Sequence, residues 1–321
     1  MKRNAKIWII VAVTLVILGT VMFSAALVAL DFDFGGLETV KYETNTYKIN
    51  EYFDNISVNT KTASVVLELS DNEVCEVVCY ERSNVKHAVS VEEGTLNVSV
   101  SDDRKWWEHI TLFSFKTPKI TVYLPRNEYS GLSVRNNTGN VNVSKDFSFE
   151  TLDISVDTSN VNVAARVSGE ARMECDTGNI NIENTSFGSA DISCDTGNIS
   201  IKSVKVNGKL CIETDTGRTK LSDTTCKTLE AESDTGNIVL ENVIADESLS
   251  LKTDTGDIIF KKSDAPEIYA KTSTGDVKGS LLSDKVFSTH TSTGKIKVPE
   301  TSQGGKCEIK TSTGNINIVI E

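Results

Sequence analysis

Apolar and polar residues alternate along most of the chain, and the alternation repeats with a period of 19 or 20 residues. In each repeat two apolar positions precede a turn, as Ala190 and Ile192 precede Gly197, and two more follow it, as Ile199 and Ile201 do. Period-two alternation on both sides of a tight turn is typical of half-buried β-strands. The pattern therefore predicts two strands per repeat, joined by a sharp corner.

The turn recurs at ten positions whose spacings are all 19 or 20 residues. Glycine reaches the positive-φ conformation of a sharp corner without the clash that a Cβ would cause. The glycines expected at these corners are Gly139, Gly178, Gly197, Gly217, Gly236, Gly256, Gly275, Gly294 and Gly314, with Ser159 at the second corner. One repeat cannot bury its own apolar face, whereas a stack of repeats can. We therefore predict an all-β, single-stranded β-helix (β-solenoid) of about ten rungs over residues 131–321, with a looser third side that includes Val204 and Val243.

Asp-Thr-Gly, the commonest form of this turn, is also the signature of the aspartic-protease catalytic loop. Such a protease depends on two specific carboxylates that share one proton. Here six repeats carry the aspartate, and four others replace it with Asn137, Ser273, Ser292 or Ser312. Because nothing marks out a pair, the motif is structural. The sequence predicts no catalytic residue, no cofactor-binding residue and no enzyme.

Residues 38–130 show strand character without the strict period. We expect a linker and the start of a cap over residues 31–55, and a β-rich cap over residues 56–130. The run from Ile56 to Leu69 aligns with the run that begins at Leu132, and it predicts a degenerate first rung with Ala63 in place of the corner glycine. An aromatic-rich insert in the cap contains Trp106 and Trp107. These rings are candidate contacts for a partner or for the membrane interface, or else one ring is simply buried.

The N-terminus contains 24 consecutive uncharged residues, from Ile7 to Leu30, enough to span a bilayer as one helix. Residues 1–6 are basic and acidic residues follow the span, so the positive-inside rule predicts a cytoplasmic tail over residues 1–6 and a signal-anchor helix over residues 7–30. The remainder, residues 31–321, is then extracytoplasmic. A cleaved signal peptide is the alternative, and small residues between Ser24 and Ala29 are compatible with cleavage.

Charge narrows the choice of partner. All 45 acidic residues and 30 of the 33 basic ones follow residue 30, which gives that part a net charge of −15. Such a surface repels phosphate backbones, so no nucleic-acid partner is expected. The turn aspartates form a predicted column of like charges. Calcium is one candidate for offsetting their repulsion, with Asp176, Asp195, Asp215, Asp234 and Asp254 as the possible ligands, although no metal site is predicted outright.

Seven cysteines cannot all pair within one chain. Cys175 and Cys194 occupy the same inward column on adjacent rungs. Two small buried thiols are the favoured interpretation, and a disulfide or a metal-binding pair is the alternative. Cys75 and Cys79 share a face of one strand if that strand is regular. None of the seven has the paired spacing of a zinc site.

The stretch "PKITVYLPRNEYSGLSVRNNTGNVNV", followed by serial "TGNI" turns, resembles a bacterial family named putative adhesin. The resemblance covers roughly residues 40–321. It implies a right-handed β-helix at the cell envelope, and it brings no catalytic residues.

Together these observations predict a non-catalytic, adhesin-like surface module anchored in the cell membrane through residues 7–30. Its partner would be a cell-wall polymer or an envelope protein. The alternative is a protein that senses envelope state or assists the assembly of another membrane protein. That second role would use an open C-terminal edge formed by the last strand, near Glu321, where association between copies is also conceivable.

Overall fold

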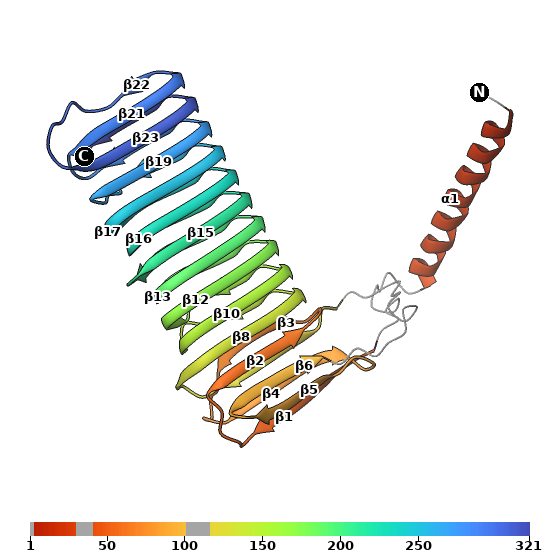
Figure 1. The fold of residues 1–321 in the computed structure, drawn as a ribbon. Coiled ribbons are helices and arrows are strands. Elements are labelled where there is room, and N and C mark those ends of the chain that lie inside the picture. The colour runs from red at the N-terminus through yellow and green to blue at the C-terminus, as the bar shows by residue number, and fades with distance from the viewer. Residues whose placement is uncertain (1–2, 30–40, 101–115) are drawn as a thin grey trace.

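The computed structural model describes residues 3–29, 41–100 and 116–321. Helix α1 (Arg3–Ala29) is the one helix among these residues. Its segment Lys6–Ala26 has a mean hydropathy of 2.5, and none of it is buried against the rest of the chain. An isolated helix of this length and composition fits a membrane span or a signal sequence. Figure 1 shows it apart from the strands, which form a single stack.

The body is a β-solenoid of about ten turns, as the sequence predicted. Its strands are β8 (Glu128–Thr138), β9 (Val141–Val143), β10 (Ser148–Thr158), β11 (Val161–Val163), β12 (Arg166–Thr177), β13 (Ile180–Thr196), β14 (Ile199–Val206), β15 (Lys209–Thr216), β16 (Thr219–Thr235), β17 (Ile238–Thr255), β18 (Ile258–Lys261), β19 (Glu267–Thr274), β20 (Val277–Leu281), β21 (Lys285–Thr293), β22 (Ile296–Lys297), β23 (Gly305–Thr313) and β24 (Ile316–Ile320). Each pairs in parallel with its neighbours in the stack (Figure 1).

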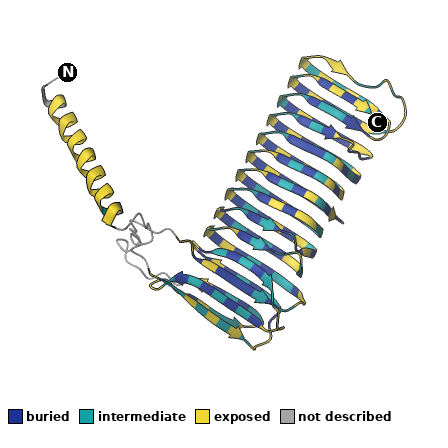
Figure 2. Ribbon diagram, turned by 180° about the vertical axis from the view of Figure 1, so that it is seen from behind, coloured by how far each residue is buried: buried dark blue, intermediate teal, exposed yellow. Residues whose placement is uncertain are grey.

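Equivalent residues of successive repeats lie opposite one another, so the apolar columns read from the sequence are the core. Leu132, Leu152 and Ala171 form one such ladder, and all three are buried. Along the strands buried residues alternate with exposed ones, which gives the banding in Figure 2. The third side also exists in the middle rungs, where Val204 pairs with Thr185 and both Val206 and Val243 are buried.

The cap contains β1 (Tyr42–Ile49), β2 (Asn55–Thr60), β3 (Ser64–Leu69), β4 (Cys75–Arg82), β5 (His87–Glu92), β6 (Thr95–Val100) and β7 (Lys119–Leu124). The expected degenerate first rung is β2–β3. Ile56 lies opposite Leu132 and Val65 opposite Val141. Strands β1 and β5 pair antiparallel, with β4 and β6 respectively. Antiparallel pairing ends the parallel stack on this side.

The two ends of the stack depart from chain order. Strand β23 pairs with β19 on one side and with β21 on the other, and β24 likewise lies between β20 and β22. The last rung of the chain is therefore inserted beneath the preceding one. The expectation that the C-terminal residues form the open edge is wrong, because β21 and β22 form it (Figure 1).

The same exchange occurs in the cap. There the first rung, β2–β3, lies between the layer of β6 and β7 and the rung of β8 and β9. At one end of the rod, β6 and β7 thus cover the first rung, β2–β3. At the other end, β21 and β22 cover the last rung, β23–β24. Both covered rungs have backbone partners on two sides.

Candidate functional site

The corner glycines lie in a stack so tight that a side chain has no room. Gly178 and Gly197 have φ values of +149° and +150°, and a Cβ on Gly197 would lie 1.5 Å from the carbonyl oxygen of Gly178. The nine glycines predicted for the corners all have positive φ. Ser159 does not, and its buried hydroxyl has no hydrogen-bond partner. The corner therefore depends on backbone conformation, and the rung of Ser159 is the exception among the ten.

At six corners, the inward residue three positions before the corner residue donates a hydrogen bond to the neighbouring rung. Cys194 Sγ donates to the carbonyl oxygen of Gly178 at 3.4 Å, and Thr272 Oγ1 donates to that of Gly256 at 2.9 Å. The same bond is made by Cys175, Thr253, Thr291 and Thr311. Cysteine and threonine interchange in this column because each supplies a small buried donor. The favoured interpretation of two small buried thiols agrees with this geometry, and all seven cysteines are free.

This role makes the side chain at position 194 testable. Cys194→Thr should leave the free energy of unfolding nearly unchanged, because the hydroxyl replaces the thiol as donor. Cys194→Val has a similar volume but no donor, and it should cost about 1 kcal/mol. Denaturant unfolding of both variants measures the difference. Equal stabilities for the threonine and valine variants would contradict the role of the hydrogen bond.

A ladder of asparagines follows the corner glycines. The side-chain amide of Asn160 donates to Asn140, that of Asn179 to Asn160 and that of Asn198 to Asn179, at 3.0–3.3 Å. In each case the backbone N–H of the donor residue contacts the same oxygen. Stacked amides of this kind join rungs through side chains as well as backbone.

The turn aspartates form an exposed column beside these amides. Burial and the charges of Asp195 and Asp157 raise the pKa of Asp176, as expected for a carboxylate between like charges. Asn137 and Ser273 each donate to a neighbouring aspartate, at 2.6 Å to Asp157 and 3.3 Å to Asp254. These hydrogen bonds reduce the repulsion between carboxylates at the two ends of the column. Calcium binding by Asp176, Asp195, Asp215, Asp234 and Asp254 stays a prediction.

A ladder of basic residues runs along one face toward the open edge. Lys252 lies opposite Lys271, Lys271 opposite Lys310, and Lys310 opposite His290 of the edge strand β21. All four side chains are exposed, and two of them form ion pairs, Lys252 with Glu232 and Lys310 with Glu308. Residues 259–321 carry nine lysines against seven acidic residues, whereas residues 131–258 carry 11 basic residues against 21 acidic ones. The rod is therefore acidic along its middle and basic toward this end.

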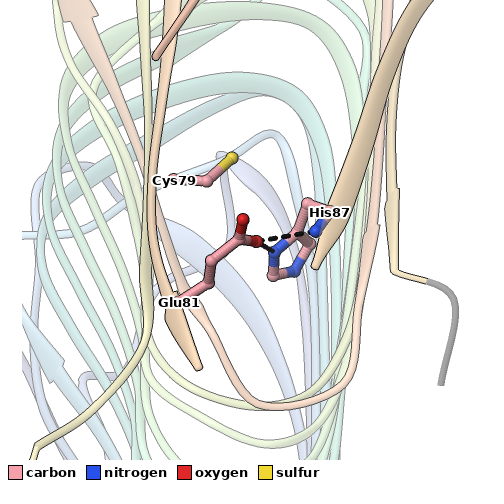
Figure 3. Close-up of side chains that lie close together, drawn as sticks. All are labelled: Cys79, Glu81 and His87. Atoms are coloured by element: carbon pink, nitrogen blue, oxygen red, sulfur yellow. Dashed lines mark hydrogen bonds and ion pairs between the residues drawn. The ribbon is translucent and has the colours of Figure 1, made fainter. Parts of the chain in front are cut away.

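The cap contains a buried group of titratable side chains that sequence reasoning missed. Cys79 and Glu81 occupy successive inward-facing positions of β4, and His87 is the first residue of β5. Figure 3 shows their side chains directed toward one another, and one ligand atom from each lies within 4.8 Å of the others. His87 Nδ1 lies 2.6 Å from Glu81 Oε2. The signal available in the sequence was a Cys-x-Glu pair on one strand face followed by a histidine across a short turn.

Polar partners surround this group. Asn45 Nδ2 donates to Glu81 Oε1 at 2.7 Å, and the backbone N–H of His87 donates to Glu81 Oε2 at 2.6 Å. Thr60 Oγ1 lies 3.0 Å from His87 Nε2. Burial, with a contribution from the charge of Glu81, raises the pKa of Cys79 to about 12. Trp106 and Trp107, the other predicted contacts, lie outside the described residues.

The architecture and these features define a β-solenoid whose repeats are held by stacked corners. Residues 53–319 match the Toastrack DUF4097 family, and the chain belongs to that family. The sequence matches none of the curated proteins.

Several crystal structures match most of this chain at low identity. A "putative lipid binding protein" from Parabacteroides distasonis ATCC 8503 is 18% identical, with a TM-score of 0.48, over 88% of this chain and 98% of that one. A "putative adhesin" from Bacteroides fragilis NCTC 9343 is also 18% identical, with a TM-score of 0.35, over 87% and 97% of the two chains. A second "putative adhesin" from P. distasonis is 12% identical, with a TM-score of 0.37, over 88% and 98%. The ligands these names suggest belong to those proteins.

Proposed function

We propose that this protein is a non-catalytic binding module, anchored in the membrane by residues 7–30, that contacts an anionic polymer of the cell envelope through the basic end of its rod. The ladder Lys252–Lys271–Lys310–His290 carries the proposal. Like charges directly opposite one another in a sheet lower stability. Glu232 and Glu308 offset the charges of Lys252 and Lys310, whereas Lys271 and His290 form no ion pair among the described residues. The positive charge that is left at this end of an otherwise acidic rod favours an anionic ligand.

The geometry suits such a contact. The cap comes directly after the apolar helix and its linker in the chain, so it is the tethered end of the rod. The basic ladder begins several rungs away, toward the opposite end (Figure 1). With the N-terminus in the cytoplasm, the ladder would lie outside the cell, several rungs from the tethered cap. Parallel strands place its side chains roughly 5 Å apart along a line. An extended polymer with regularly spaced acidic groups matches a line of that kind.

The test compares two double variants that change the net charge equally. Lys271→Gln with Lys310→Gln should lower the affinity of the full-length protein for purified envelope polyanion roughly tenfold, since each exposed ion pair contributes up to about 1 kcal/mol. Lys202→Gln with Lys205→Gln, two exposed lysines in the middle rungs, should leave the affinity unchanged. Co-sedimentation at increasing salt measures both, and wild-type binding should weaken as salt rises. If both double variants lost affinity equally, net charge alone would explain the binding, and the ladder would not be the site.

One observation favours a second candidate function, in envelope sensing or assembly with another membrane protein. Among the described strands, β21 and β22 pair on one side only, with β23 and β24, and they expose Val286 and Ile296. An unpaired edge with apolar side chains is a template for strand addition. Crosslinking in cells discriminates the two functions. A specific membrane protein attached at β21 or β22 would favour assembly, and its absence together with retention on cell wall would favour polymer binding.

A further inference from the structure

We propose that Cys79, Glu81 and His87 form a binding site for one divalent transition-metal ion of the zinc class, buried inside the cap. The donor set is a thiol, a carboxylate and an imidazole, which are the three side-chain types that bind zinc in proteins. All three residues are buried, with exposed fractions of 0%, 1% and 5%. Cys79 is a free cysteine, and among the described residues its sulfur has no hydrogen-bond partner.

The surrounding contacts orient the three ligands as metal ligands are oriented. Asn45 holds the Oε1 oxygen of Glu81, which leaves Oε2 facing His87, and Thr60 contacts the Nε2 nitrogen of His87, which leaves Nδ1 facing Glu81. Figure 3 shows the sulfur of Cys79 above this pair. A hydrogen-bonded partner on the second imidazole nitrogen is the usual outer support of a metal-bound histidine.

The distance between His87 Nδ1 and Glu81 Oε2, 2.6 Å, is that of a hydrogen bond. Two nitrogen or oxygen ligands of a tetrahedral zinc ion lie roughly 3.3 Å apart, so the carboxylate must move by less than about 1 Å when the ion replaces the shared proton. The Cys79 sulfur lies within 4.8 Å of the other two ligand atoms and must approach them to roughly 3.6 Å. That proton passes to Nε2, which then donates to Thr60. The Cys79 thiol releases its own proton to solvent.

Charge balance favours the occupied state. The thiolate of Cys79 and the carboxylate of Glu81 supply two negative charges, and neutral His87 supplies none. The complex with a divalent ion is then neutral, which lowers the cost of burying it. A water molecule would complete the four ligands of a tetrahedral ion.

A metal here would staple the cap. Asn45 belongs to β1, Thr60 to β2, Cys79 and Glu81 to β4, and His87 to β5. Strands β4 and β5 would then supply the ligands of one ion, and β1 and β2 would support these ligands through hydrogen bonds. Because the ligands are buried, the ion would exchange slowly, so loading and removal of the metal need long incubation or refolding.

The experiment measures metal content and its effect on unfolding in the full-length protein, purified in detergent and reconstituted with zinc. Wild-type protein is expected to retain stoichiometric zinc through gel filtration. Cys79→Ser and His87→Gln should lose it, and Thr60→Val should bind about 10- to 100-fold more weakly. Cys75→Ser is the matched control, because Cys75 is a buried cysteine on the same face of the same strand. It should retain the metal.

Removal of zinc with a chelator should lower the unfolding midpoint of the wild type and of Cys75→Ser, but not that of Cys79→Ser. Cobalt substitution gives an independent reading on unaltered protein, because a cobalt–thiolate bond adds a charge-transfer band in the near ultraviolet. Wild-type protein without bound zinc, without this band and with a midpoint insensitive to zinc would overturn the proposal. The cluster would then be a hydrogen-bonded network only.

Discussion

Gly197→Ala is expected to destabilise the solenoid by about 3–5 kcal/mol, among the largest effects of any single substitution in this chain. The new Cβ would lie 1.5 Å from the carbonyl oxygen of Gly178 and 2.6 Å from its carbonyl carbon. Neither backbone can yield. The N–H of Gly197 donates to Thr216 at 2.9 Å, and the N–H of Gly178 donates to Thr196 at the same distance, so a shift at one corner breaks bonds on both sides.

Denaturant unfolding of the variant measures the loss. Thr196→Ala is the control, because Thr196 is the exposed residue immediately before the glycine. It should change the free energy of unfolding by less than about 0.5 kcal/mol. If Gly197→Ala were as stable as this control, the corners could not be as closely stacked as described.

Lys285→Met is expected to cost about 3–5 kcal/mol through a different mechanism, the loss of one partner from a buried ion pair. Lys285 is 1% exposed, and its Nζ lies 2.6 Å from Asp264 Oδ1 and 2.5 Å from Ser283 Oγ. The lysine begins the edge strand β21, whereas Asp264 follows β18. The pair therefore connects the outermost rung to a segment beyond the inserted rung. Its loss leaves the Asp264 carboxylate largely buried without a counter-charge.

Rungs of a solenoid contact only their neighbours, so this loss should be local. Hydrogen exchange should show faster opening of β21 and β22 with β13 unaffected. The double variant Lys285→Met with Asp264→Leu removes both charges and should recover much of the stability. Lys306→Met is the control, because Lys306 forms an exposed pair with Glu267 at 3.8 Å and should matter little. Uniform destabilisation along the rod would contradict the conclusion that the Lys285–Asp264 ion pair stabilises only the rungs near the open edge.

The columns of the solenoid could be read from the sequence because each depends on one residue per repeat. Period-two alternation fixes which side chains point inward, and the glycine spacing fixes which ones stack. Ile192 follows Met173 in the sequence columns and lies opposite it in the structure. The corner needed only the rule that a positive φ excludes a Cβ. The same reasoning located the degenerate rung with Ala63, where the period had already decayed.

The exchanged order of the last rungs could not be read in this way. The steps from Gly275 to Gly294 and from Gly294 to Gly314 are 19 and 20 residues, the same as elsewhere. The period therefore gives no information about the order in which these rungs stack. A clue lies in Gly304 and Gly305. A Cβ on either residue would meet backbone oxygen, that of Asp284 at 1.8 Å or that of Pro266 at 2.1 Å, where the returning chain passes between two segments.

The candidate sites depended on contacts across strands that sequence distance conceals. His87 meets Thr60, 27 residues earlier, and Glu81 meets Asn45, 36 residues earlier. The basic ladder was hidden for a related reason, because Lys271 and Lys310 are adjacent only once the last rung is inserted. Net charge along the whole chain pointed toward an acidic surface and away from this local exception.

The covered terminal rungs restrict how proteins of this shape can lengthen during evolution. A repeat duplicated at either extremity would have to be threaded between two rungs that already pair, whereas one duplicated in the interior, among β10 to β17, needs only a matching corner. New rungs should therefore arise in the middle of the gene. For the same reason, a domain fused after Glu321 would emerge from the flank of the rod, one rung below its tip, and would leave the edge of β21 and β22 free.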